Sequence, residues 1–147
     1  MPGAALTLWM MAAQDTQPLE INGIPPALAG QTCDGLIRQS YVYRGKLSAP
    51  AHTIYLLFAG TWHRLYFDCG IVFWRIQETR PEAWSVKEKG WDYPHSDLGI
   101  EAGVTGVRLD GYDMEPTRYG SKVCFRFANG RRIIIEDASD QTSYEIR

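Results

Sequence analysis

Three short β-rich segments follow one another in the middle of this chain, and they limit the possible fold more than any other feature. Residues 52–58, 62–68 and 71–77 are rich in β-branched and aromatic side chains, which favour extended backbone. Only Ala-Gly-Thr and Cys-Gly separate them, and such short glycine-containing breaks are typical of tight hairpin turns. The sequence therefore predicts an antiparallel meander of three strands.

A similar pattern recurs near the C-terminus. The segment IYLLFAGTWHRLYFD (54–68) aligns with VCFRFANGRRIIIED (123–137) after a one-residue deletion, and both carry a glycine at the expected turn. A third β-rich segment follows the second copy at residues 142–146. Duplication and chance similarity of two amphipathic hairpins both remain open, because alternation with a period of two residues is easily matched. In either case the sequence predicts a second three-stranded meander.

The other segments are less regular. Residues 27–47 fit either a short helix or strand fragments, and we favour mostly extended structure there. Residues 104–109 predict a strand that ends at the turn signal Asp110-Gly111. We predict a mainly β fold over residues 19–147, with about eight to ten strands at a spacing of roughly 8–12 residues. Its antiparallel meanders are expected to form one sandwich or one curved barrel-like sheet. The alternative is an α+β fold with a short helix near residues 27–40, and residues 1–18 are expected to be a loose lead-in. The predicted core consists of Leu56, Phe58, Leu65, Phe67, Val72, Trp74, Phe125, Phe127, Ile133 and Ile135.

The composition excludes some classes of partner. With 147 residues, of which 45% are hydrophobic, the chain has the size and the apolar content of a single packed domain. Its formal net charge of -2 gives no overall electrostatic attraction to nucleic acid or to anionic lipid. Charged or strongly polar residues also interrupt every apolar run before it reaches the length of a membrane span. We therefore expect neither nucleic acid nor a membrane as a partner.

The cysteines and the first residues indicate the cellular compartment. Cys33, Cys69 and Cys124 lie far apart, and their odd number suits a reducing environment better than a disulfide framework. The first residues are small and apolar, as in a signal peptide, but no Lys or Arg precedes this short apolar run. We expect a cytoplasmic protein without a cleaved signal.

The residues that could carry metal or covalent chemistry do not form a recognisable motif. On an unbroken strand His63 and Cys69 are about six residues, or roughly 20 Å, apart, too far to share one zinc ion. A core-facing cysteine and an edge histidine are the simpler expectation. Cys124 lies between Lys122 and Arg126 on one strand face, which is typical of a solvated basic surface. We therefore expect no catalytic residue, no cofactor and no metal, and hence no enzyme.

Acidic residues are concentrated in one segment. Between residues 91 and 115 there are six acids and a single base, Arg108, and aromatic residues are interleaved with the acids. Aromatic side chains supply most of the binding energy at many protein interfaces, and acids steer a basic partner toward them. A solvated set of loops would explain the same pattern. The predicted partner-binding residues are Trp91, Asp92, Tyr93, Asp97, Glu101, Asp110, Tyr112, Asp113 and Glu115.

The two hairpins, FRFANGRRIIIED and YLLFAGTWHRLYFD, together with this acidic aromatic segment, resemble the small immunity proteins encoded beside bacterial polymorphic toxins, including those of contact-dependent inhibition systems. The resemblance covers about a third of the chain in hairpin pattern. It implies a cytoplasmic, non-catalytic protein that binds a toxin domain, often a basic nuclease, and neutralises it by covering its active site.

A second hypothesis comes from a different class of protein. Tyr41, Tyr43, Tyr55 and Trp74 could line an apolar cavity inside a β-barrel or sandwich that binds a small ligand.

Overall fold

Strands dominate the part of the chain that the structure describes, residues 18–147 of a computed structural model, so nearly all of the expected lead-in over residues 1–18 lies outside it. Both predicted meanders are confirmed, and each is a run of three antiparallel strands joined by short turns. The first consists of β3 (Lys46–Phe58), β4 (Thr61–Asp68) and β5 (Ile71–Gln77), and the second of β10 (Gly120–Phe127), β11 (Arg132–Ala138) and β12 (Gln141–Ile146).

Each meander is extended into a sheet by strands from other parts of the chain. The first sheet has the order β1-β5-β4-β3-β2-β7-β6, with β8 also paired to β2, and the second has the order β12-β11-β10-β9. The β1–β5 pair is parallel and the other pairs are antiparallel. The added strands are β1 (Ile21–Asn22), β2 (Cys33–Tyr43), β6 (Trp84–Val86), β7 (Trp91–Tyr93), β8 (His95–Asp97) and β9 (Leu109–Pro116).

The fold class is mainly β, as predicted. The described residues form twelve strands rather than eight to ten, because β1, β6, β7 and β8 have only two or three residues each. Helical structure is limited there to a 3-10 turn at Lys87–Lys89 and to α2 at Leu98–Ala102, and neither is long and apolar enough to cross a membrane.

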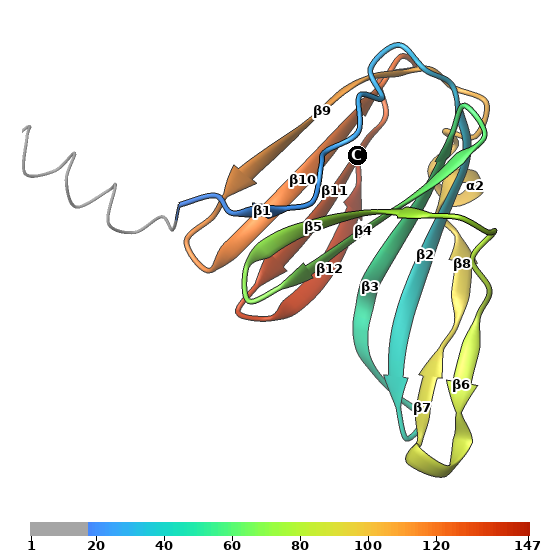
Figure 1. Ribbon diagram of the computed structural model, residues 1–147, viewed down its shortest axis with the longest axis vertical. Helices are drawn as coiled ribbons and strands as arrows, with labels where there is room; N and C mark the ends of the chain where they lie inside the picture. Colours follow the sequence, from blue (N-terminus) through green and yellow to red (C-terminus); the bar gives the residue numbers. More distant parts are fainter. Residues whose placement is uncertain (1–17) are drawn as a thin grey trace, which may run out of the picture.

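The core lies between the inner faces of the two sheets, which together form an open sandwich (Figure 1). Nine of the ten predicted core residues are buried, and the tenth, Phe67, is partly buried against them. Trp74 of β5 joins the two sheets, because its indole Nε1 lies 3.3 Å from the sulfur of Met114 on β9. Its ring centre is also 5.4 Å from that of Tyr112.

One alternative and one prediction about individual elements are wrong. The alternative helix near residues 27–40 is absent, since Cys33–Tyr43 forms β2, an inner strand paired with β3. The expected strand over residues 104–109 is also absent, because the chain turns there through Gly103 and Gly106, both with positive φ. The strand begins only at Leu109 and runs through the supposed turn at Asp110-Gly111, where the pairing with β10 contains a bulge. A glycine inside a strand often marks such a bulge, so the turn signal has another explanation.

The outer ends of β2 and β3 carry the first sheet past the edge of the second one. Beyond register shifts near residues 39–42, β2 pairs with β7, and β7 pairs in turn with β6. Bulges of this kind bend and twist a strand. In Figure 1 these segments extend below the second sheet. We call residues 41–49 and 84–93 the arm.

Candidate functional site

The nine residues predicted to bind a partner do not form one surface. They lie at three places: on β7 in the arm, around α2, and along β9 at the edge of the second sheet. Figure 1 shows these elements at separate positions on the molecule. They are close in the sequence, but β7 belongs to the first sheet and β9 to the second.

The acids of β9 are paired with bases. The carboxylate of Asp113 accepts a hydrogen bond from the guanidinium of Arg126 on β10, and Glu115 lies 3.8 Å from the ammonium of Lys122. Asp110 lies 3.4 Å from the guanidinium of Arg108. Two acids of the segment, Asp113 and Glu115, therefore form cross-strand ion pairs with the basic residues on either side of Cys124. This pairing reduces the charge that these acids could present to a basic partner.

The acids near α2 and the aromatic ring on β9 have structural roles. Asp97 caps the helix by accepting the N–H of Ile100, and Glu101 accepts the hydroxyl of Tyr144. Tyr112 is half-buried against Trp74, and its hydroxyl donates to a backbone carbonyl, which places its ring in the sandwich and not on the surface.

Trp91 and Tyr93 belong to a larger group of aromatic rings in the arm. Trp84 faces Tyr93 across the β6–β7 pair, and their rings stack with centres 4.0 Å apart. The ring of Tyr93 also stacks on Tyr41, 5.0 Å away. Tyr43 faces Trp91 across the β2–β7 pair, and residues two apart on a strand share a face. We call this group the aromatic face: Tyr41, Tyr43, Trp84, Trp91 and Tyr93.

The aromatic face carries positive charge at its rim. The ammonium of Lys89 lies 4.5 Å from the centre of the Trp91 ring, and the guanidinium of Arg44 lies 5.2 Å from that of Tyr43. Cations over aromatic rings are attracted by the electrons of the ring face. The arm as a whole has four basic residues, Arg44, Lys46, Lys87 and Lys89, against the two acids Glu88 and Asp92.

The residues of the ligand-cavity hypothesis do not meet around one space. Strand register places Trp74 beside Leu65 and Ile54, which face the core, whereas Tyr55 is one residue further along β3 and points to the opposite face. Tyr41 and Tyr43 lie in the arm.

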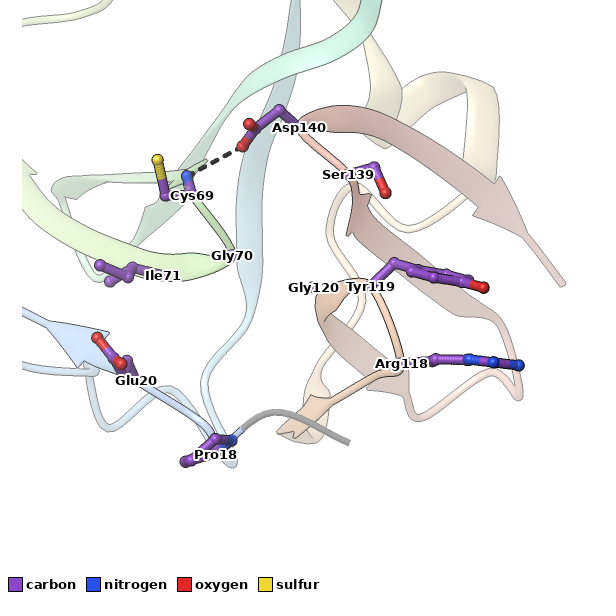
Figure 2. A pocket seen from close by; sticks show the side chains of 10 residues that line it. All are labelled: Pro18, Glu20, Cys69, Gly70, Ile71, Arg118, Tyr119, Gly120, Ser139 and Asp140. Atoms are coloured by element: carbon purple, nitrogen blue, oxygen red, sulfur yellow. Dashed lines mark hydrogen bonds between the residues drawn. The ribbon is translucent and has the colours of Figure 1, made fainter. Parts of the chain in front are cut away.

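A pocket of about 370 Å³ lies where the two meanders meet at their turns. Figure 2 shows Cys69, Gly70 and Ile71 on one side and Arg118, Tyr119, Gly120 and Ser139 on the other. Asp140 reaches across, and its carboxylate accepts the backbone N–H of Cys69 at 3.1 Å. Arg118 points away from Asp140 in this view, and its guanidinium lies 5.3 Å from the ring centre of Tyr119.

Two tight turns from different meanders make this contact. Cys69-Gly70 joins β4 to β5, and Ser139-Asp140 joins β11 to β12; all four residues have positive φ, as in the two-residue turns of twisted hairpins. Gly70 is fixed to the second sheet, because its carbonyl accepts the hydroxyl of Ser121 at 2.8 Å.

Cys69 is exposed at this turn, so the expectation that it faces the core is wrong: β4 ends one residue earlier, at Asp68. The carboxylates of Asp68 and Asp140 raise the pKa of its thiol, because negative charge opposes formation of the thiolate. The same two carboxylates and the thiol sulfur lie within 4.8 Å of one another.

Asp137 lies beneath the same turn. Its side chain is buried, with the residue only 2% exposed, and its oxygen Oδ2 has no hydrogen-bond partner. Burial and the negative charges of Asp140 and Asp68 raise its pKa, against the smaller opposing effect of the Gly70 backbone and the Thr142 side chain.

The raised pKa of Asp137 predicts a pH-dependent stability. Above about pH 4 the unfolded chain releases this proton while the native protein still holds it, so the free energy of unfolding falls as the pH rises toward the native pKa. The Asp137→Asn variant lacks this contribution. Urea denaturation at a series of pH values measures the free energy of unfolding of both proteins. We expect the difference between the two free energies to change between about pH 4 and the native pKa of Asp137, and to be constant at higher pH. Asp92→Asn, an exposed control, should follow the wild type, and parallel profiles for Asp137→Asn would contradict the prediction.

Sequence reasoning identified two of the five rings of the aromatic face and missed the turn cluster. Tyr41 and Tyr43 entered only the ligand-cavity hypothesis and Trp84 entered none, because their grouping depends on the pairing of β2 with β7, across about fifty residues of chain. Asp68 and Asp140 are brought together by the docking of one meander on the other, for which the sequence has no local signal. Comparisons with known protein families, with curated proteins and with solved structures find no match to this chain, so its function has to be inferred from its own geometry.

Proposed function

We propose that this protein is a non-catalytic immunity protein, which binds a bacterial toxin domain and neutralises it by covering its active site through the aromatic face of the arm. The immunity type rests on the resemblance of the two hairpins. The three free cysteines support a reducing compartment, and we place the protein in the cytoplasm.

The observation that carries this proposal is the aromatic face itself. Five Trp and Tyr rings share one face of a sheet that extends past its partner sheet, and Trp84 and Tyr43 remain 47% and 39% exposed. Tyr and Trp are enriched among residues that dominate binding energy at protein interfaces. Stacking holds Tyr41, Trp84 and Tyr93 in place before binding, so these three rings lose little side-chain freedom on association.

Charge at the arm indicates the kind of surface that fits it. The bases outnumber the acids by two in the arm, and Arg44 and Lys89 lie directly over rings of the aromatic face. A complementary partner would present apolar side chains surrounded by carboxylates. The contact patch on the toxin is then acidic, whereas the sequence predicted a basic one. A basic nuclease would fit only if it carried an acidic patch at the contact surface.

The test uses the product of the adjacent toxin gene as the partner. Trp84→Ala and Tyr93→Ala should each weaken the complex at least tenfold, because each removes a ring of the stack. Tyr119→Ala is the matched control, since Tyr119 is an aromatic residue, 61% exposed, outside the arm. Affinity is measured by calorimetry, and neutralisation by growth of cells that express the toxin with each variant.

The two parts of the proposal fail in different ways. A complex that tolerates both arm substitutions would exclude the aromatic face as the contact surface. A toxin that is neither bound nor neutralised by the wild-type protein would exclude the immunity function. Circular dichroism of each variant establishes that the fold is retained.

A further inference from the structure

The aromatic face of the arm continues onto the outer face of the first sheet. β7 and β8 pair with β2 in one register, in which Tyr43 lies opposite Trp91 and Gln39 lies opposite His95. Residues an even number of positions apart on a strand share a face, so all four side chains lie on the same side of the sheet. The ring nitrogen Nε2 of His95 lies 2.8 Å from the amide oxygen of Gln39. The aromatic face therefore belongs to a larger surface of the first sheet.

This surface crosses the sheet in rows of cross-strand neighbours. Ile54, Leu65 and Trp74 form a row that faces the core, so the rows on either side of it face away from the second sheet. These two outer rows run from β2 to β5, one through Gln39, Thr53, Tyr66 and Phe73, and the other through Ile37, Tyr55, Arg64 and Arg75.

A buried polar contact fixes the outer rows relative to the arm. The hydroxyl of Tyr55 donates to the amide oxygen of Gln39 at 3.4 Å, and His95 contacts the same oxygen. Tyr55 and Gln39 are only 7% and 3% exposed. The aromatic face and the outer rows are therefore held at a fixed spacing.

Two arginines lie directly opposite each other in the outer rows. Arg64 on β4 faces Arg75 on β5, and both side chains are half-buried. The guanidinium of Arg64 lies 5.1 Å from the ring centre of Tyr66, and that of Arg75 lies 5.5 Å from the ring centre of Phe73. These two rings stack with centres 4.8 Å apart. We call the four residues the arginine patch. Like charges directly opposite on a sheet are unfavourable, and a bound anion would offset that cost.

The charge of the arginine patch is not neutralised by the protein. Within residues 18–147, neither Arg64 nor Arg75 takes part in an ion pair. The buried nitrogen Nε of Arg64 also has no hydrogen-bond partner. Arg75 donates to oxygens of Asn22 and Trp74, which are neutral groups and leave its charge in place.

A similar arginine pair in the second sheet has a counterion. Arg126 and Arg132 also lie directly opposite each other, but the carboxylate of Asp113 is paired with Arg126. On the face that carries the arginine patch, Asp97 lies at the β8 end of the row and caps α2, and Asp68 is the last residue of β4. The arginine patch is therefore the better place for an acidic group of a partner.

We propose that the toxin-binding surface extends from the aromatic face to the arginine patch, where Arg64 and Arg75 bind carboxylates of the toxin. This inference rests on the proposed function. A guanidinium holds a carboxylate with two parallel hydrogen bonds, and an aromatic ring beneath it fixes its plane. An acidic protein surface fits better than nucleic acid, because the net charge of -2 gives the chain no overall attraction to a polyanion.

The extent of this surface suits a single protein partner. It runs about 20 Å along β2 from Tyr43 to Ile37, and about 10 Å across the two strand spacings from β2 to β4. A standard interface buries about 800 Å² on each partner, which corresponds to a patch roughly 30 Å across. One toxin domain can therefore contact the aromatic face and the arginine patch together.

The experiment measures the affinity of the toxin for the full chain and its variants by calorimetry at low and high salt. Arg64→Gln should weaken the complex at least tenfold and reduce its salt dependence, because the toxin carboxylate loses its charged partner. Arg64→Lys keeps the charge without the two parallel donors, so its affinity should lie between those of Arg64→Gln and the wild type. Arg132→Gln is the matched control: this exposed arginine also faces another arginine, but on the second sheet, and its loss should leave the affinity unchanged.

Thermal unfolding separates lost contact from lost fold. Arg64→Gln removes repulsion between two like charges, so its melting temperature should not fall below that of the wild type. Weaker binding by Trp84→Ala together with unchanged binding by Arg64→Gln would overturn the role of the arginine patch and would leave the proposed function intact.

A toxin that does not bind the wild-type protein would exclude the proposed function, and the arginine patch is then tested alone. The probe is poly-L-glutamate, and the readout is the NMR signal of each arginine Nε–H. The signals of Arg64 and Arg75 should shift and that of Arg132 should not. Absence of these shifts would overturn the proposal, as would tighter binding of oligothymidylate than of poly-L-glutamate.

Discussion

Trp74→Ala is expected to lower the free energy of unfolding by about 3–5 kcal/mol, the range for removal of a large buried aromatic side chain. Trp74 is 2% exposed and lies between the sheets, where its ring packs on Tyr112 and its indole nitrogen lies 3.3 Å from the sulfur of Met114. The substitution removes contacts to both sheets at once, and β-strands cannot close the space by a local shift of one side chain.

Urea denaturation followed by circular dichroism measures this loss. Trp84→Ala is the matched control, because Trp84 is 47% exposed and its main contact is the stacked ring of Tyr93. The control should cost about 1 kcal/mol, the scale of an aromatic pair. Equal losses for the two variants would mean that Trp74 does not hold the two sheets together.

Gly120→Ala is the second substitution with a large expected effect. A β-carbon at this position would overlap the carbonyl oxygen of Asp137 on the neighbouring strand and would lie 2.8 Å from its carbonyl carbon. Both atoms belong to the backbone of β11, so the clash can be relieved only by separating β10 from β11 where their pairing begins. We expect a loss of about 3 kcal/mol, at the upper end of the range for overpacked sites.

Gly130→Ala separates this effect from backbone strain. Gly130 has a φ of 86°, and within residues 18–147 no atom other than those of its chain neighbours lies within 4 Å of a β-carbon placed on it. The substitution therefore causes backbone strain without a clash. Its cost should be about 1–2 kcal/mol, less than that of Gly120→Ala in the same denaturation experiment. The reverse order would contradict the account of Gly120.

The parts of the fold that depend on local pattern could be predicted from the sequence. Alternation with a period of two residues identified both meanders and nearly the whole core, because each strand of a meander pairs with its neighbour in the chain. The sequence pattern failed to predict the local structure where one residue type is common in two kinds of structure. Gly111 marks a bulge within β9, although Asp-Gly more often marks a turn.

The candidate sites were less predictable because both depend on contacts between distant segments. Tyr43 meets Trp91 only through the β2–β7 pair, and Asp140 meets Cys69 only through the docking of the two meanders. Six acids do lie in residues 91–115, but three of them are paired with bases: Asp113 and Glu115 with residues of β10, and Asp110 with Arg108, just before β9. The distribution of charged residues along this sequence therefore did not predict the distribution of charge on the folded surface.

The two meanders also differ in when they are synthesised. Each is made of neighbouring segments, so its strands can pair soon after they leave the ribosome, at little cost in loop closure. The inner face of the first meander, with Leu65 and Trp74, nevertheless stays uncovered until residues 120–146 have followed. During this interval the growing chain presents an apolar sheet to its surroundings, and it is then most in need of a chaperone.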